Sequence, residues 1–120
     1  MVYHIVMLKE PADLSPEQRT RLVRAFEHAV REIPTVRSVH LSRRVFIGTS
    51  YEGQMPDIDH AIIIEFDNIA GLRTYLEHQA HDELSNRFAE TIVSPLIYDF
   101  ESVGLQSLRD GPKKKPDVVV

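Results

Sequence analysis

Segments with strand-like and helix-like hydrophobic patterns follow one another in a fixed order along this chain: strand, helix, strand, strand, helix, strand. Stretches rich in β-branched and aromatic residues predict strands at residues 3–9, 36–47, 58–66 and 96–103. Apolar residues recur at helical spacing between Ser15 and Pro34 and again between Asn68 and Pro95. This order predicts an α+β, ferredoxin-like βαββαβ sandwich, an antiparallel sheet with both helices on one face.

The helix boundaries are encoded locally. Ser15, Pro16 and Gln18 supply an N-cap hydroxyl, a proline at the first helical position and the third-position amide of a capping box. Asn68 is expected to cap the second helix. The run His-Gln-Ala-His at residues 78–81 is expected to bend this helix before its apolar pattern resumes at Leu84.

Alternate residues of the predicted strands point to the same face of the sheet, and several residues on one such face are apolar. With the helices on one face, the other face must also be buried against something. The economical cover is a second copy of the chain, packed sheet to sheet across a two-fold axis. We therefore predict a homodimer through the sheet face. The residues that we assign to this interface from their parity are His4, Val6, Leu8, Ile62, Ile64 and Phe66.

Composition narrows the classes of partner. The chain has 120 residues and no cysteine, so it forms no disulfides. Its formal net charge of −4 argues against a nucleic-acid partner. No apolar run approaches the roughly 18 residues that span a membrane, so no membrane partner is expected. With no signal-peptide pattern at the N-terminus, we expect a cytoplasmic protein.

The C-terminal residues stand apart from the repeating pattern. We expect one domain at residues 1–104 and a tail at residues 105–120, in which Asp110, Gly111 and Pro112 resemble a linker. Such a tail is usually disordered, although its final three valines have the composition of an added strand that docks on a partner subunit.

His81 and Tyr75 are the candidate catalytic residues. Histidine accepts and returns a proton near neutrality, and His81 follows the first part of the second helix, with Tyr75 as a hydrogen-bonding partner or second acid. The plainer alternatives are that His81 caps a helix C-terminus and that Tyr75 is a core residue with its hydroxyl at the surface.

Other histidines and aromatic residues are expected nearby. His4 and His60 are candidate ligand-binding residues, or else satisfy backbone groups of a neighbouring strand, while Phe26 and Phe88 are expected to line or close the same pocket. His78 is three residues from His81, but the zinc signature His-Glu-x-x-His is absent, so no metal is expected. No dinucleotide fingerprint or phosphate-binding loop occurs, and we expect no cofactor.

Four stretches together resemble the stress-responsive dimeric A/B barrel (Dabb) family over residues 2–102. They are the opening strand with His4, the pair Asp59 and His60, the segment from Tyr75 to His81, and the closing Tyr-Asp-Phe-Glu at residues 98–101. The resemblance implies a ferredoxin-like subunit whose dimer forms an α+β barrel, with a pocket in each subunit between sheet and helices.

The resemblance also implies a range of functions. Our leading hypothesis is a stress-responsive protein that binds a small, mainly apolar, carbonyl-bearing molecule. A plant polyketide cyclase of this fold catalyses a cofactor-free aldol condensation and is similar at His4, His60, Tyr75 and His81, which implies a cyclase, isomerase or lyase that uses His81 and Tyr75. A cofactor-free monooxygenase and a purely structural dimer are further alternatives. This chain departs from the cyclase at Phe26, where the enzyme has a tyrosine, and at Gln79, where it has a proline.

Overall fold

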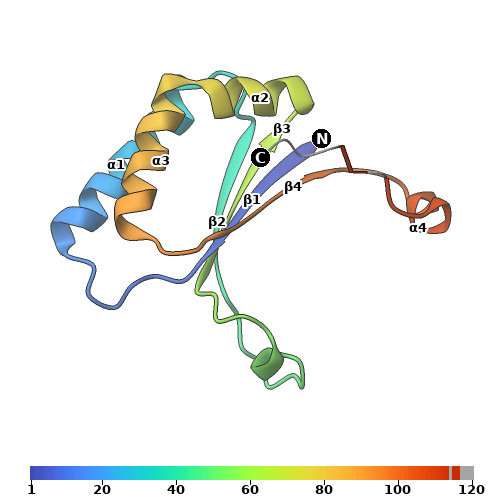
Figure 1. The fold of residues 1–120 in the computed structure, drawn as a ribbon, viewed down its shortest axis with the longest axis horizontal. Helices are drawn as coiled ribbons and strands as arrows, with labels where there is room; N and C mark the ends of the chain where they lie inside the picture. Colours follow the sequence, from blue (N-terminus) through green and yellow to red (C-terminus); the bar gives the residue numbers. More distant parts are fainter. Residues whose placement is uncertain (114, 117–120) are drawn as a thin grey trace.

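The computed structural model of the chain describes residues 1–113, 115 and 116. Strands and helices occur in the order that the sequence predicts, followed by a short additional helix (Figure 1). The elements are β1 (Val2–Leu8), α1 (Pro16–Glu32), β2 (Ser38–Arg43), the 3-10 turn η1 (Glu52–Gln54), β3 (His60–Phe66), α2 (Ile69–Glu77), α3 (Gln79–Thr91), β4 (Leu96–Glu101) and α4 (Gln106–Asp110).

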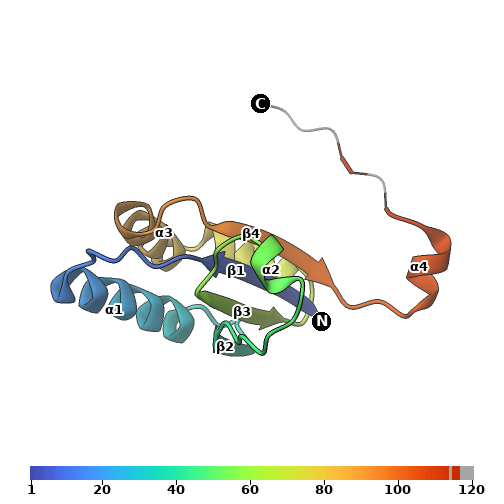
Figure 2. The same cartoon turned by 90° about the horizontal axis from the view of Figure 1, so that it is seen from below.

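The four strands form one antiparallel sheet in the order β2-β3-β1-β4. Helices α1 and α3 pack side by side on one face of this sheet (Figures 1 and 2). This arrangement confirms the predicted ferredoxin-like α+β fold. None of the described helices is both long and apolar enough to cross a membrane.

The predicted helix boundaries are confirmed at their caps. The Ser15 hydroxyl accepts from the Gln18 backbone N–H at 3.1 Å, and the Gln18 side chain accepts from the Ser15 N–H at 2.9 Å, which completes the capping box. Asn68 caps α2 through Gly71. The predicted bend lies at His78, which ends α2 and whose Nδ1 accepts from the Ala80 N–H to start α3.

The assignment of one strand face to a dimer interface was wrong. His4, Val6 and Ile64 are buried within a single chain, and Val6 and Ile64 belong to one hydrophobic cluster with residues of α1, α2 and α3. Successive side chains of a strand point to opposite faces of the sheet. The helices therefore cover the face to which these residues point, and none of the described helices covers the opposite face. We call the latter the free sheet face. Its apolar and aromatic residues are Tyr3, Ile5, Met7, Ala61, Ile63, Leu96, Tyr98 and Phe100, and its polar residues are Glu65 of β3 and Ser38, His40 and Ser42 of β2.

Two segments differ from the predicted pattern. The second strand is shorter than the predicted 36–47 because the chain leaves the sheet after Arg43, and residues 44–59 form an arm that projects from the sheet (Figure 1). The tail contains a helix, α4, which the sequence did not predict. Leu105, which precedes this helix, and Leu108 within it are both exposed. The predicted docking of the final three valines lies outside the described residues.

Candidate functional site

A cavity of about 470 Å³ lies between the sheet and the helices. Its lining is mostly apolar: Val6, Ile62 and Ile64 come from the sheet, Phe26 from α1, and Leu84, Phe88 and Ile92 from α3 and its end. Ser85 and Ala89, which also line the cavity, are exposed, so the cavity meets solvent along α3. An apolar cavity of this size with a few polar groups fits a small organic molecule.

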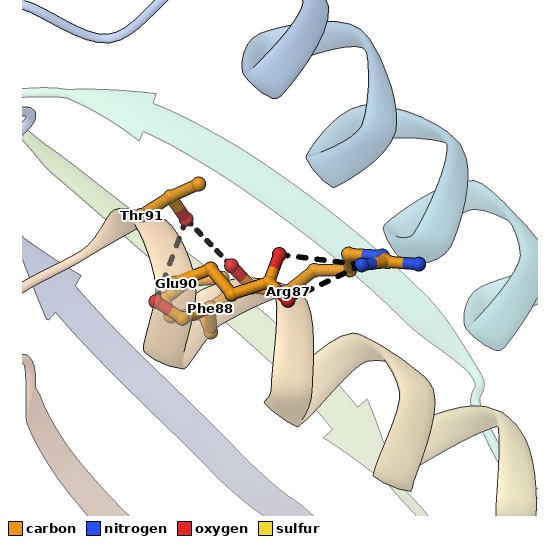
Figure 3. A network of polar contacts seen from close by, with 4 residues as sticks. All are labelled: Arg87, Phe88, Glu90 and Thr91. Carbon is orange, nitrogen blue, oxygen red and sulfur yellow. Dashed lines mark hydrogen bonds and ion pairs between the residues drawn. The ribbon is translucent and has the colours of Figure 1, made fainter.

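The end of α3 is held in place by its own polar contacts (Figure 3). The Thr91 hydroxyl donates to the backbone carbonyl of Arg87 at 2.8 Å, and the Ile92 N–H donates to the carbonyl of Phe88 at 2.7 Å. Arg87 pairs with Glu90 at 3.2 Å on the outer side of the helix. These contacts close the last turn and fix the backbone that carries Phe88 and Ile92 into the cavity lining.

Four polar side chains of the lining form a row of contacts, from Asp99 through His4 and Tyr75 to His81. His4 lies on β1, and its Nδ1 is 2.6 Å from the Asp99 Oδ1 on β4. The Tyr75 ring, on α2, packs against both histidines, with centroid distances of 5.7 Å to His4 and 4.8 Å to His81. The fold therefore brings together side chains from two strands and two helices.

The surroundings keep two of these groups uncharged near neutrality. Burial raises the pKa of Tyr75 to about 12, so its hydroxyl keeps its proton. Burial, with a smaller contribution from the neighbouring His4, lowers the pKa of His81 below its ordinary 6.5, so its imidazole is neutral at pH 7. A neutral imidazole beside a protonated phenol is a base beside an acid.

The predicted site residues divide into two groups. The structure brings His4, Phe26, Tyr75, His81 and Phe88 to one cavity. His60 is not in its lining. It starts β3 at the far end of the same face and lines a neighbouring cavity of about 400 Å³, which shares Phe26, Ile62, Phe88 and Ile92 with the first.

The alternative roles that we considered for the helical residues are also decided by their positions. His81 lies in the first turn of α3, so it does not cap a helix C-terminus, and the capping histidine is His78. Tyr75 is a core residue, only 2% exposed, that also packs on Phe66 at 5.3 Å. Among the described residues, no three His, Asp or Glu side chains are placed to hold a metal ion.

Asp99 is the functional candidate that reasoning from the sequence missed. It is the direct cross-strand partner of His4 in the pairing of β1 with β4. The signal was present, because a ferredoxin-like order places the first and last strands side by side, and Asp99 lies between the aromatic residues Tyr98 and Phe100. The exact register of the two strands was required to pair it with His4.

The lowered pKa of His81 makes a prediction about stability. The folded state disfavours the protonated imidazole, so this contribution to stability is fully present above pH 6.5 and is lost as the pH falls through the lower folded-state pKa. In urea unfolding at pH 7.5 and pH 5, the wild type is expected to lose more stability than His81→Asn, which cannot titrate. His4 and Asp82, the two side chains whose charges act on the pKa of His81, are present in both proteins and serve as the common background. Equal losses in the two proteins would contradict the assignment of His81 to a desolvated site.

Comparisons with known proteins agree on the fold. The family model for the Stress responsive A/B Barrel Domain matches residues 2–102. A crystal structure of an Arabidopsis thaliana protein is similar with a TM-score of 0.71 and 21% identity, covering 88% of this chain and 98% of that chain. A dimeric ferredoxin-like protein of unknown function from Bacteroides fragilis has a TM-score of 0.58 and 25% identity, with coverages of 84% and 95%. Hydroxynitrile lyase from Passiflora edulis has a TM-score of 0.68 and 16% identity, with coverages of 82% and 90%. A search of curated protein sequences found no match.

Proposed function

The chain belongs to the Stress responsive A/B Barrel Domain family, and we propose that it binds a small, mainly apolar, carbonyl-bearing molecule in the cavity between the sheet and the helices. The observation that carries this proposal is the row of contacts formed by Asp99, His4, Tyr75 and His81 in the lining of an apolar cavity. The apolar lining suits the body of such a ligand, and the polar row suits its carbonyl group. The proposal keeps residues 1–104 as the binding domain and residues 105–120 as a tail.

The same row has the parts of a cofactor-free acid-base catalyst. Neutral His81 is the proposed general base, which takes a proton from the carbon next to the ligand carbonyl. Tyr75, protonated at neutral pH, is the proposed donor to the carbonyl oxygen, where negative charge develops as that proton leaves. This division of roles fits a cyclisation, isomerisation or lyase step. The occurrence of the fold in a hydroxynitrile lyase is compatible with it.

His4 is proposed to act as a second donor or acceptor whose orientation is set by Asp99. A carboxylate at 2.6 Å from Nδ1 favours the tautomer with a proton on that nitrogen, which leaves Nε2 as the unprotonated one. Phe26 and Phe88 are proposed to contact the apolar part of the ligand. His60 is proposed to meet only a ligand long enough to enter the neighbouring cavity, whose lining it shares with both phenylalanines.

We further propose that the protein is a homodimer through the free sheet face. Several similar structures are dimeric ferredoxin-like proteins. In this chain Tyr98 and Phe100 stack on each other with centroids 6.2 Å apart and are each about half exposed. Ile5 and Ile63, which are cross-strand partners, lie beside them at the centre of the face. A contiguous apolar surface of this kind is typical of an interface.

Ligand binding is expected to raise the melting temperature of the wild type and not that of His81→Ala. The test compounds are phenols, polyketide-like acids and short aldehydes, because binding to the native state must stabilise it. His28→Ala is the matched control, since His28 lies on α1 and does not line the cavity. It is expected to keep the full shift.

The outcomes separate the functional hypotheses. A shift that requires His81 supports binding at the polar row and justifies assays for turnover with the same compounds. A shift that survives in His81→Ala contradicts the proposed site. If no compound shifts the wild type, binding of this ligand class fails and the purely structural dimer becomes the better account.

A further inference from the structure

The arm at residues 44–59 presents more apolar surface than a connection between two strands requires. Five of its bulky side chains are at least half exposed, with Ile47 reaching 75%. They are Val45, Phe46, Ile47, Tyr51 and Met55. The arm projects away from the sheet and both main helices (Figure 1). A contiguous apolar patch of this kind marks an interaction surface.

Polar contacts hold the arm in one shape although it has no core of its own. The Arg44 guanidinium donates to the carbonyls of Glu52 and Pro56, both at 3.0 Å, and lies 4.7 Å from the centroid of the Phe46 ring. The Glu52 carboxylate accepts from the Ile47 N–H at 2.7 Å and from the Gly48 N–H at 3.1 Å. The arm is therefore ordered before binding, which reduces the entropy cost of docking.

The arm is continuous with the free sheet face. A hollow of about 520 Å³ is lined by Met7, Leu96 and Tyr98 from the sheet and by Tyr51 and Met55 from the arm. Of the five exposed apolar side chains of the arm, Val45, Tyr51 and Met55 line this hollow and so lie on the side of the proposed dimer interface, whereas Phe46 and Ile47 do not line it. The occupant that this continuity favours is a second copy of the chain.

The directions of the strands show where the partner's arm would lie. The edges of the sheet are β2 and β4, which run antiparallel to each other because each pairs antiparallel with its inner neighbour and β1 and β3 are antiparallel. A two-fold axis parallel to the strands places β4 of one copy beside β2 of the other in antiparallel orientation, so that both edges are covered. That operation brings the arm, which leaves the sheet where β1 ends and β4 begins, over the start of β4 in the partner.

We infer that the arm at residues 44–59 of each copy clasps the partner subunit, packing its apolar side chains on the free sheet face around Leu96 and Tyr98. This inference rests on the homodimer proposed above. It adds a second contact region to the sheet-to-sheet interface and explains why an exposed connection is both apolar and rigidly held.

Substitutions in the arm test the inference. The quantity to measure is the dissociation constant of the dimer, obtained by sedimentation over a dilution series. Met55→Asp is expected to raise this constant by about tenfold or more, because a charge enters an apolar contact. Gln54→Asp adds the same charge at an exposed neighbour and is expected to leave it unchanged. An unchanged constant in Met55→Asp overturns the clasp. If Met55→Asp has no effect but Ile63→Asp dissociates the dimer, the proposed homodimer is retained and the clasp is refuted. A wild type that is monomeric at every concentration refutes the homodimer as well.

Cross-linking tests the contact directly, because the chain has no native cysteine. Met55→Cys and Leu96→Cys, one of them tagged, are mixed, allowed to exchange subunits and treated with a short bis-maleimide reagent. A cross-linked species that contains both variants is expected. Cross-linking of Met55→Cys only to itself, or no product in the mixture, overturns the placement of the arm on the partner's β4.

Discussion

Ile64→Asp is expected to prevent the chain from folding. Ile64 lies at the centre of β3, is 1% exposed and belongs to the cluster between the sheet and the helices. A new carboxylate would lie among the apolar side chains of this cluster, and its cross-strand neighbour His4 is already paired with Asp99. A buried charge without a partner costs several kcal/mol, comparable with the roughly 5–15 kcal/mol that hold a domain together. Circular dichroism and urea unfolding measure the outcome.

The adjacent residue provides the matched control. Ile63 points to the opposite, free face of the same strand and is half-buried. Ile63→Asp is therefore expected to keep the secondary structure and the cooperative unfolding transition, while sedimentation shows a monomer. A folded Ile64→Asp variant, or an Ile63→Asp variant that unfolds, would contradict the assignment of the two faces.

The elements of the fold were predictable because their signals are local. The Ser15 capping box and Asn68 define helix starts through side chains that lie within three residues of the groups they cap. His78 is a similar case, since its Nδ1 caps the helix that begins at the next residue. The alternation along β1 is equally local, because each buried residue is followed by a half-buried one.

The face that the helices cover was not predictable from this alternation. Both faces of β1 and β3 carry aliphatic residues, so His4 and Ile64 could be grouped by parity but not assigned to a side. The start of the arm was assigned wrongly for a related reason: a connection was expected only from Gly48 to Asp57, because Val45, Phe46 and Ile47 have strand propensity. Arg44 instead binds the carbonyls of Glu52 and Pro56 and holds this segment away from the sheet.

The candidate site was predictable in part. His81 and Tyr75 were identified from residue chemistry, and their positions at one cavity depend on the bend at His78. The contact of Asp99 with His4 depends on strand register between residues 95 positions apart, which no local pattern specifies.

Tyr75 carries the second large effect, because it serves both the core and the proposed site. Its ring is 2% exposed and contacts Phe66, His4 and His81. Tyr75→Ala is expected to lower the free energy of unfolding by about 3–5 kcal/mol, as removal of a buried aromatic ring leaves a cavity. Urea unfolding at pH 7.5 measures this loss.

Tyr75→Phe separates the hydroxyl from the ring. None of the hydrogen bonds among the described residues uses the Tyr75 hydroxyl, so its removal is expected to change the free energy of unfolding by less than about 1 kcal/mol. If this hydroxyl donates to a ligand carbonyl, compounds that stabilise the wild type should bind Tyr75→Phe about tenfold more weakly, the loss of roughly one hydrogen bond. Unchanged affinity with unchanged stability would leave Tyr75 a core residue and remove the acid from the proposed mechanism.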